Sequence, residues 1–204
     1  MKHIITINRE FGSGGREVGK RLAELRGIAY YDNEIITKIA ERNSLAEDYV
    51  QSIIEQKPIR YYPIMIGRSF YTMPDPFFVQ SAKIYEEQYQ IISELARKSD
   101  CVIIGRCADY ILREYQTVNI FVYADISSRI RRCQQKSPIE EHLTEQELTR
   151  KIISIDKNRA AYYKSFTGQK WGEMRNYHLC LNTSTVTIKN IIAPLSDLIS
   201  EMQA

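Results

Sequence analysis

The segment ITINREFGSGGREVGKRLAE, near the start of the chain, constrains the fold most strongly. A β-rich apolar run, His3–Asn8, leads into the glycine-rich stretch GSGG at positions 12–15, and a helical pattern with Val18, Leu22 and Leu25 on one face follows. Glycine allows positive φ and close approach to a ligand, and the N–H groups of such a loop and of the helix start point at one place. The segment therefore predicts a strand, an anion-binding loop and a helix in succession.

The loop departs from the strict phosphate-binding pattern G-x-x-x-x-G-K-[ST] at three positions. Arg9 stands where the first glycine would be, Gly15 replaces the lysine, and Arg16 replaces the serine or threonine. The context of the pattern survives, with a strand before the loop, a helix after it, and the cations Arg16 and Lys20 in the first helical turns. The loop is a candidate phosphate site, and a glycine-rich turn without a ligand is the alternative.

The rest of the chain alternates short apolar runs with helical patterns. Four further runs are typical of strands: Ile28–Tyr31, Cys101–Ile104, Val118–Tyr123 and Tyr177–Asn182. Near-continuous apolar strands separated by helices predict an α/β protein in which a five-stranded parallel sheet is covered on both faces.

Several helix starts are also predicted. A helix from about Asn33 has Asp32 as its candidate N-cap. The capping-box pattern occurs at Ser44–Glu47 and at Thr144–Glu147, and it predicts that helices begin there. A long helix is predicted over about residues 79–98.

Two regions interrupt the alternation. Residues 57–78 are rich in aromatic residues and proline, without a clear period, which is typical of a lid, a binding loop or an arm. Their aromatic side chains favour packing within an arm or at a homo-oligomer interface over a base-stacking platform. Residues 129–170 are helical in pattern and strongly basic. We expect motion or partner contact in these two regions.

Charge and cysteine content argue against several classes of function. The net charge of +3, from 28 Lys and Arg against 25 Asp and Glu, is too small for a chain that coats nucleic acid or an anionic membrane. No apolar stretch approaches the roughly 18 residues of a membrane span, and three dispersed histidines predict no transition-metal site. The four cysteines are Cys101, Cys107, Cys133 and Cys180, and none forms a Cys-x-x-Cys pair, which is typical of reduced thiols in a cytoplasmic protein. Two of them, Cys101 and Cys180, lie in predicted buried strands.

Taken together with LAELRGIAYYDNEII, CVIIGRCADYIL, FVYADISSRIRR and NYHLCLNTS, the loop gives the chain a clear resemblance. From Ile4 to about Ser184 it resembles the cytidylate kinase-like family, a branch of the P-loop nucleoside monophosphate kinases. The resemblance implies a three-layer P-loop kinase fold with a five-stranded parallel sheet in a single domain, residues 1–204. It also implies an acceptor-side helical arm at about residues 33–98 and a helical lid at about residues 129–170.

On the donor side, the resemblance implies that the loop and the helix start hold the triphosphate of ATP. The residues concerned are Gly12, Ser13, Gly14, Gly15, Arg16 and Glu17. Arg16, the nearest cation, is the candidate to stand in for the missing lysine. Arginine has a planar fork suited to phosphate but a different reach, so this exchange is not conservative.

On the acceptor side, Asp32 resembles the aspartate that begins the acceptor-nucleotide site. Arg106 resembles the arginine of the family's Gly-Arg-Asp motif, which holds the acceptor phosphate, and a cation at the end of a buried strand sits where α/β sheets bind ligands. Cys107 occupies the aspartate's position of that motif, and Asp109 is the nearest carboxylate. The alternative for Asp32 is a helix cap alone.

Arg129, Arg132 and Arg159 resemble lid arginines that close over the phosphates. Phosphoryl transfer needs mainly alignment and cations against the charge of the transferring oxygens, which three converging arginines could supply. The alternatives are a solvated helix face for the basic run, and for Arg159 a helix pair with Asp156.

The resulting expectation is a kinase that uses ATP and Mg²⁺ and phosphorylates CMP, dCMP or a similar small phosphorylated acceptor. The magnesium ligand stays open between Asp125, Ser13 and water. One rival is a kinase of the same fold for another small metabolite. A second rival is a nucleotide-binding regulatory protein that lost catalysis with its lysine. A nucleic-acid binder is disfavoured by the small net charge.

Overall fold

The computed structural model describes residues 2–55, 76–136 and 143–203. Within these ranges five parallel strands form one sheet in the order β2-β3-β1-β4-β5, which confirms the predicted five-stranded parallel sheet. The strands are β1 Ile4–Arg9, β2 Ala29–Tyr31, β3 Cys101–Ile104, β4 Thr117–Tyr123 and β5 Leu179–Asn182. β1 lies at the centre, where Ile7 is paired with Ile104 on one side and with Ile120 on the other.

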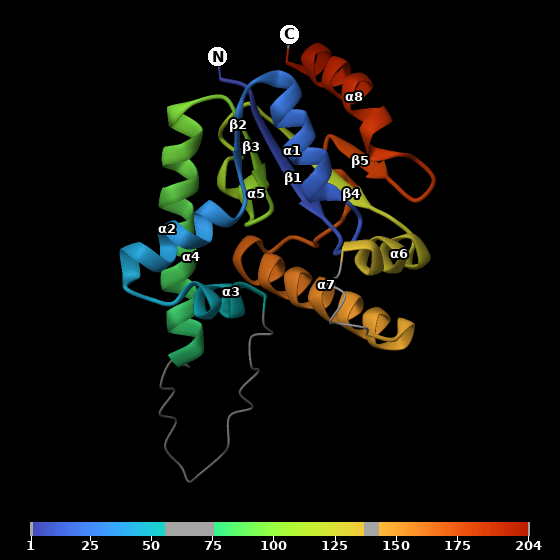
Figure 1. Cartoon of the computed structure of the whole chain (residues 1–204). Coiled ribbons are helices and arrows are strands. Elements are labelled where there is room, and N and C mark those ends of the chain that lie inside the picture. Colours follow the sequence, from blue (N-terminus) through green and yellow to red (C-terminus); the bar gives the residue numbers. More distant parts are fainter. Residues whose placement is uncertain (1, 56–75, 137–142, 204) are drawn as a thin grey trace.

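Helices lie on both faces of this sheet (Figure 1). They are α1 Gly15–Arg26, α2 Asn33–Asn43, α3 Glu47–Glu55, α4 Pro76–Lys98, α5 Ala108–Ile111, α6 Ile126–Lys136, α7 Glu145–Thr167 and α8 Ile188–Met202, with a 3₁₀ turn, η1, at Met174–Asn176. Both termini lie at one end of the sheet, and α3, α6 and α7 lie at the opposite end (Figure 1). Because all strands are parallel, that opposite end carries their carboxyl ends, where α/β folds bind ligands.

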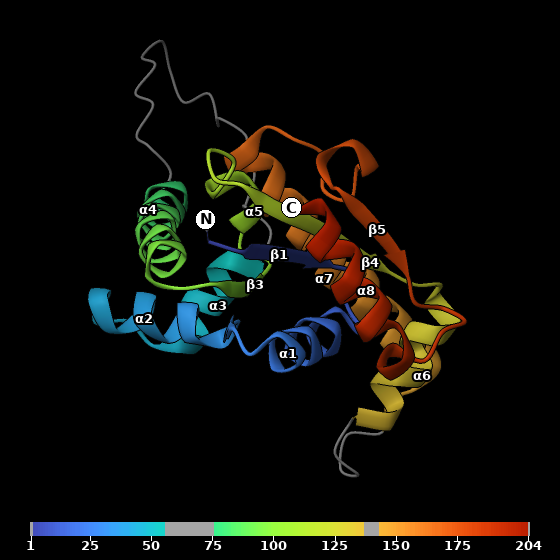
Figure 2. The same ribbon diagram turned by 90° about the horizontal axis from the view of Figure 1, so that it is seen from above.

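The two faces of the sheet have separate cores. Cys101 and Ile103 of β3 join the apolar cluster that includes α4 and α5, while Val102 and Ile104 join the cluster of α1 and α8. Figure 2 shows α1 and α8 together on one side of the sheet, away from α4. Consecutive strand residues point to opposite faces, so a strand buried on both faces has a continuous apolar sequence. This explains why the strands were recognisable in the sequence.

Three sequence predictions are wrong in detail. Leu25 is 56% exposed, and the buried face of α1 is completed by Ala23 instead. Ser44 does not cap α3; it ends α2 in a left-handed conformation with φ of 51°. Cys180 is exposed on β5, because Leu179 and Leu181 face the cluster of α1 and α8 and Cys180 between them points to the other face of the sheet.

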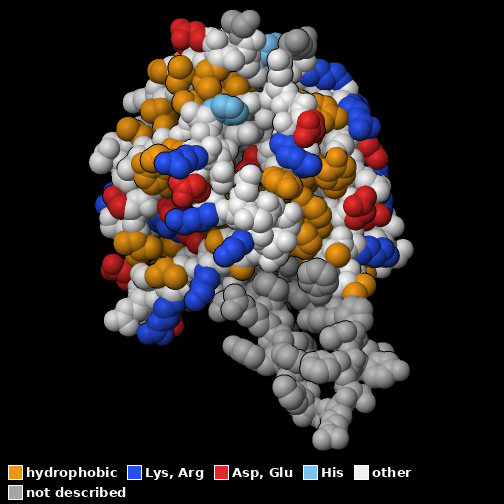
Figure 3. Space-filling model, turned by 180° about the vertical axis from the view of Figure 1, so that it is seen from behind, with side chains coloured by type: hydrophobic (Ala, Val, Ile, Leu, Met, Phe, Trp, Pro, Cys, Tyr) orange, Lys and Arg blue, Asp and Glu red, His pale blue; other side chains and the backbone are white. Residues whose placement is uncertain are grey.

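The basic stretch 129–170 contains most of α6 and the whole of α7, as its helical pattern predicted. The predicted capping box is present: the N–H of Glu147 donates to the Thr144 hydroxyl at 3.3 Å, and the N–H of Thr144 donates to the Glu147 carboxylate at 2.8 Å. Buried Ile130 and Ile152 hold α6 and α7 together beside Phe11 of the glycine-rich loop. Figure 3 shows the molecule from behind, with Lys and Arg side chains gathered at the lower left and Asp and Glu side chains among them.

The aromatic and proline-rich region 57–78 lies outside the described residues, apart from the start of α4 at Pro76. The predicted arm packing and homo-oligomer contact of this region therefore stay predictions. The described part of residues 33–98 is helical, formed by α2, α3 and α4. No helix in the described ranges has the length and apolar character needed to cross a membrane.

Candidate active site

The glycine-rich loop runs from the carboxyl end of β1 to the first turn of α1. Gly12 and Gly14 have φ of +77° and +87°, a region that side-chain-bearing residues rarely adopt. A Cβ atom at Gly14 would also lie 2.3 Å from Cδ1 of Ile188 in α8. Gly14 is the N-cap of α1 and places no side-chain cap on the helix. The first N–H groups of α1 are thus arranged as in an anion-binding helix start.

Arg129 of α6 anchors this loop to α7. Its Nε donates to the carbonyl oxygen of Phe11 at 2.7 Å, its Nη1 lies 3.2 Å from the Glu10 carboxylate, and its Nη2 pairs with Asp156 of α7. The N–H of Phe11 donates to Asp156 at 2.8 Å, so both polar groups of the Phe11 residue are held. Arg129 is buried, and its contacts position the loop.

Arg132 holds the other side of the loop. Its Nη1 donates to the carbonyl oxygen of Ser13 at 3.3 Å, and its Nη2 donates to the carbonyl oxygen of Thr183, just after β5. The Thr183 hydroxyl donates to the same Ser13 carbonyl at 2.6 Å. The Ser13 hydroxyl donates to the carbonyl oxygen of Glu10 at 2.9 Å, and Ser13 is fully buried. These residues fix the shape of the loop from behind.

Arg16 joins the start of α1 to the start of α2. Its Nε pairs with the Asp32 carboxylate and its Nη2 donates to Oδ1 of Asn33 at 3.0 Å, while its side chain is 54% exposed. Asp32 occupies the N-cap position of α2 but makes no side-chain cap hydrogen bond. The buried Asp32 carboxylate faces arginines of the loop instead, so its role differs from that of an ordinary cap.

Arg9 is a site residue that the sequence analysis treated only as a missing glycine. Its side chain is 9% exposed and its Nη2 lies 3.7 Å from the Asp32 carboxylate. A Cβ at Gly105 would lie 1.9 Å from Nη1 of Arg9, so the guanidinium passes directly against that glycine. The signal for Arg9 was present in the sequence, because a cation at the end of a buried strand had already marked Arg106.

Arg159 of α7 reaches the same place. Its Nη1 donates to the carbonyl oxygen of Arg9 at 3.3 Å, and its guanidinium carbon lies 5.6 Å from the centre of the Phe11 ring. The alternative helix pair with Asp156 is present as well, with a long separation of 4.0 Å. Arg159 therefore contacts both the strand end and the loop.

Arg106 lies in a strained turn after β3. Gly105, Arg106 and Cys107 have consecutive positive φ values of 64°, 58° and 53°. Left-handed geometry in residues other than glycine costs roughly 1 to 2 kcal/mol each, and such strain gathers at functional sites. The buried Arg106 is held in this turn by Gln88, whose Nε2 donates to its carbonyl oxygen at 2.7 Å.

Asp109 lies in α5 beneath this turn and is 5% exposed. Its carboxylate accepts a hydrogen bond of 2.7 Å from the hydroxyl of Tyr163 in α7. Burial raises the pKa of Asp109, and the hydrogen bond from Tyr163 opposes that rise. Asp109 thus connects the turn that carries Arg106 to α7.

The raised pKa of Asp109 predicts a pH-dependent stability. The folded protein keeps the Asp109 carboxyl group protonated to a higher pH than the unfolded chain does. The stabilisation that this difference in pKa provides is therefore fully present below about pH 3.9 and is lost as the pH rises through the folded pKa. Asp109→Asn cannot ionise, so it avoids this loss of stability at high pH, and its amide oxygen can still accept the hydrogen bond from the Tyr163 hydroxyl. We expect the variant to resist urea better than the unmodified chain at pH 7, with a difference that narrows toward pH 4. A difference independent of pH would contradict this.

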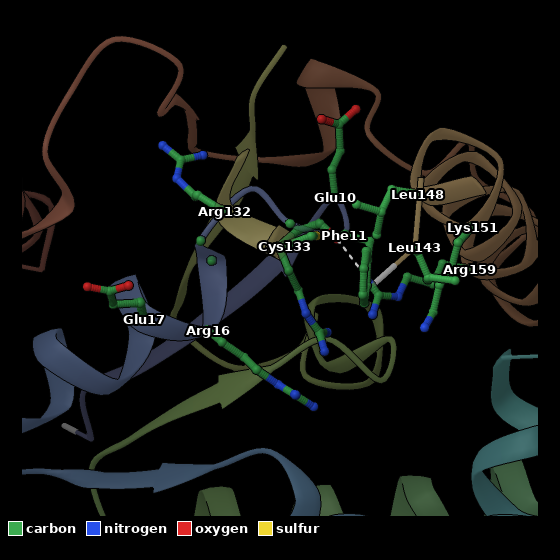
Figure 4. A pocket seen from close by; sticks show the side chains of 14 residues that line it. Glu10, Phe11, Arg16, Glu17, Arg132, Cys133, Leu143, Leu148, Lys151 and Arg159 are labelled. Atoms are coloured by element: carbon green, nitrogen blue, oxygen red, sulfur yellow. Dashed lines mark hydrogen bonds between the residues drawn. The ribbon is translucent and has the colours of Figure 1, made fainter. Parts of the chain in front are cut away.

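A cavity of about 310 Å³ lies over the glycine-rich loop. Loop residues and the first turn of α1 form one wall, and Glu17 of α1 lines it while pairing with Arg21 at 3.0 Å. Figure 4 shows Phe11 beside Arg159, with Leu148 of α7 on the same side of the cavity. Apolar residues such as Leu148 of α7 and polar loop groups thus line one cavity over the start of α1.

A second cavity of about 40 Å³ lies against the strained turn. Arg106, Tyr162 and Trp171 line it. Arg9 and Arg159 line both cavities, so the two cavities adjoin at these arginines.

The residues near the loop do not form a cation site of their own. The Ser13 hydroxyl is buried against Glu10. Asp125 caps α6, since its carboxylate accepts from the N–H of Ser128 at 2.8 Å and from the Ser127 hydroxyl, and these bonds lower its pKa to about 2. Across the described ranges, no three His, Cys, Asp or Glu side chains are grouped to hold a metal ion.

A central strand, a glycine-rich loop and a helix start, with arginines around them on a parallel sheet, define a P-loop kinase fold. Solved structures share this fold: a shikimate kinase from Bacteroides thetaiotaomicron is 16% identical with a TM-score of 0.58, covering 97% of this chain and 98% of that one. A gluconokinase from Sinorhizobium meliloti 1021 is 12% identical with a TM-score of 0.54, covering 98% and 93%. An uncharacterized protein from Eubacterium ventriosum ATCC 27560 is 24% identical with a TM-score of 0.71, covering 98% and 99%.

The chain belongs to the cytidylate kinase-like family, whose family model matches residues 4–185. This confirms the family resemblance drawn from the sequence. None of the curated proteins compared with the chain matches its sequence.

Proposed function

We propose that this protein transfers the γ-phosphoryl group of ATP to CMP, dCMP or a similar small phosphorylated acceptor. The observation that carries the proposal is the junction of two cavities at the carboxyl end of the sheet, with Arg9 and Arg159 in the wall of both. A phosphoryl donor over the loop and an acceptor beside Arg106 would place the transferred group at this junction. The family and the fold of the kinases above support the same reading.

On the donor side, the N–H groups of the loop and of the α1 start would bind the triphosphate. Arg16 and Glu17 line the same cavity from α1, and Arg159 faces it from α7. Arg129 and Arg132 would act as positioning residues, because their bonds to the loop carbonyls keep its N–H groups turned to the ligand. Mg²⁺ would enter with ATP as part of the substrate, held by phosphate oxygens and water.

On the acceptor side, Arg106 would bind the acceptor phosphate and Asp32 would orient the arginines around it. An oxygen of the acceptor phosphate attacks the γ-phosphorus, and the bond to the β,γ-bridging oxygen breaks, so that ADP leaves with the electron pair. This step needs alignment and cations, and no protein group has to exchange a proton. Asp109 would act through Tyr163 by keeping the lid helix close to the turn of Arg106.

Replacement of Arg106 tests the acceptor side. We expect Arg106→Ala to raise the acceptor KM at least tenfold with a small change in the KM for ATP, because a charged hydrogen bond to phosphate is lost on one side only. The control is Arg113→Ala, which removes an exposed arginine paired with Glu114. Steady-state kinetics with each substrate varied in turn measure both constants. An unchanged acceptor KM in Arg106→Ala would remove Arg106 from this role.

The proposed reaction is tested by ADP release from Mg-ATP with CMP, dCMP, UMP, AMP, GMP, shikimate, gluconate and no acceptor. We expect release with CMP or dCMP at least ten times the rate without acceptor. Shikimate and gluconate are included because a shikimate kinase and a gluconokinase share this fold. ADP release stimulated only by one of these two would favour the alternative, a kinase of another metabolite. ATP binding without turnover of any acceptor would favour the regulatory alternative.

A further inference from the structure

Arg9 and Gly15 together reverse the usual arrangement of charge in the loop. The pattern G-x-x-x-x-G-K places glycine first and the cation after the second glycine, whereas this chain has arginine first and glycine in the cation's place. The two positions touch: a Cβ at Gly15 would lie 2.4 Å from Cβ of Arg9 and 3.3 Å from Cβ of Val122. A side chain at position 15 is therefore incompatible with Arg9 in its present place.

The side chain of Arg9 leads from the strand end to the junction of the two cavities. Its guanidinium lies against Gly105, where any Cβ would displace it, and 3.7 Å from the Asp32 carboxylate. Arg9 shares the wall of both cavities with Arg159. Because Gly15 and Gly105 have no side chains, the space that the Arg9 side chain occupies is open.

The charges around Arg9 favour an anion beside it. Burial lowers the pKa of Arg9, and the nearby guanidinium groups of Arg159, Arg106 and Arg16 lower it further, while Asp32 is the carboxylate that raises it. Arg9 thus lies near three other arginines, with the Asp32 carboxylate 3.7 Å from its Nη2. A phosphoryl group with two negative charges would offset this repulsion, and such preorganised charge is the main means of catalysis in phosphoryl transfer.

We propose that Arg9 does the work of the P-loop lysine, donating N–H groups to the oxygens of the transferring phosphoryl group at the junction of the two cavities. This inference rests on the proposed function. The bond that forms joins the acceptor oxygen to the γ-phosphorus, and the bond that breaks releases ADP. Arg9 keeps its protons throughout. Arg16, which the sequence suggested for this role, is half-exposed and paired with Asp32, and the same assays test it through Arg16→Ala.

A double-mutant cycle tests the exchange of charge directly. We expect Arg9→Gly to lower kcat at least 100-fold, and Gly15→Lys alone to be equally poor because Arg9 blocks the new side chain. The combined variant restores the first glycine and the lysine of the pattern, with Arg16 still in place of the serine or threonine, and we expect its kcat to be at least ten times that of Arg9→Gly. Arg113→Ala, an exposed arginine, serves as the control and should retain full kcat. Full activity in Arg9→Gly, or no gain in the combined variant, would overturn the proposal.

A binding readout separates this role from a structural one. Arg9→Met keeps an unbranched apolar stem, and we expect its thermal unfolding midpoint without ligand to match that of the unmodified chain, while the upward shift caused by Mg-ATP falls by at least half. A lower midpoint together with an unchanged kcat would show that Arg9 only supports the fold.

The same readout keeps the two proposals apart. The unmodified chain could phosphorylate none of the acceptors while the rise of its unfolding midpoint with Mg-ATP still depends on Arg9. The proposed function then fails, and the contact of Arg9 with phosphate stands. If the chain is an active kinase and Arg9→Met loses neither kcat nor the shift, the assignment of Arg9 fails and the proposed function stands.

Discussion

Gly105→Ala is expected to lower kcat at least 100-fold, while Gly27→Ala leaves it unchanged. Both glycines have φ of +64°, so each alanine carries the same left-handed strain of roughly 1 to 2 kcal/mol. They differ in what a Cβ would meet: Gly27 has nothing within 4 Å, whereas at Gly105 the Cβ would lie 1.9 Å from Nη1 of Arg9. The end of a flexible side chain can move, so the protein should fold with Arg9 displaced from the cavity junction.

The pair of variants separates strain from function. Urea denaturation should give similar losses in the free energy of unfolding for the two, within about 1 kcal/mol, because the backbone cost is shared. The kinetic assay should then distinguish them. Equal kcat values for Gly105→Ala and Gly27→Ala would contradict the placement of Arg9 at the reacting centre.

Arg129→Ala should lower the free energy of unfolding by about 3 kcal/mol. Removal of one partner from a buried ion pair leaves its carboxylates uncompensated, and we take the lower end of the usual range because the Glu10 side chain is 27% exposed. The Phe11 carbonyl also loses its donor, so the loop should loosen and the affinity for Mg-ATP should fall at least tenfold.

The neighbouring Arg131 provides the matched control. It is exposed on the same helix, α6, and Arg131→Ala should change the free energy of unfolding by less than about 0.5 kcal/mol. Urea denaturation measures the stability and calorimetric titration with Mg-ATP measures the affinity. If the two alanine variants are equally stable, the anchoring of the loop by Arg129 is wrong.

The fold was predictable because its signals are local. β3 is apolar throughout and β4 is apolar from Ile120 to Tyr123, since both faces of the sheet are covered. The capping box at Thr144 depends on a residue only three positions away. Ser44 shows the limit of such signals. The same pattern occurs there, but the left-handed end of α2 takes the residue that the cap of α3 would need.

The candidate site was predictable in its members and not in its contacts. The arginines expected around the loop do lie around it. Their partners, however, are distant in sequence: Arg129 pairs with Asp156, 27 residues away, and Arg132 donates to Thr183, 51 residues away. Local patterns carry no information on such pairs, which depend on how α6, α7 and β5 pack. Arg9 was missed because the motif was compared position by position, and its relation to Gly105 exists only in the folded sheet.

The most direct test of a working loop without its lysine is transfer of label from γ-³²P-ATP. The purified chain is incubated with Mg-ATP and CMP, and the products are separated from inorganic phosphate. We expect label in CDP, with far less label in inorganic phosphate, since a closed site excludes water as the acceptor. Label found only in inorganic phosphate, at a rate that is the same with and without CMP, dCMP or the other acceptors, would contradict it.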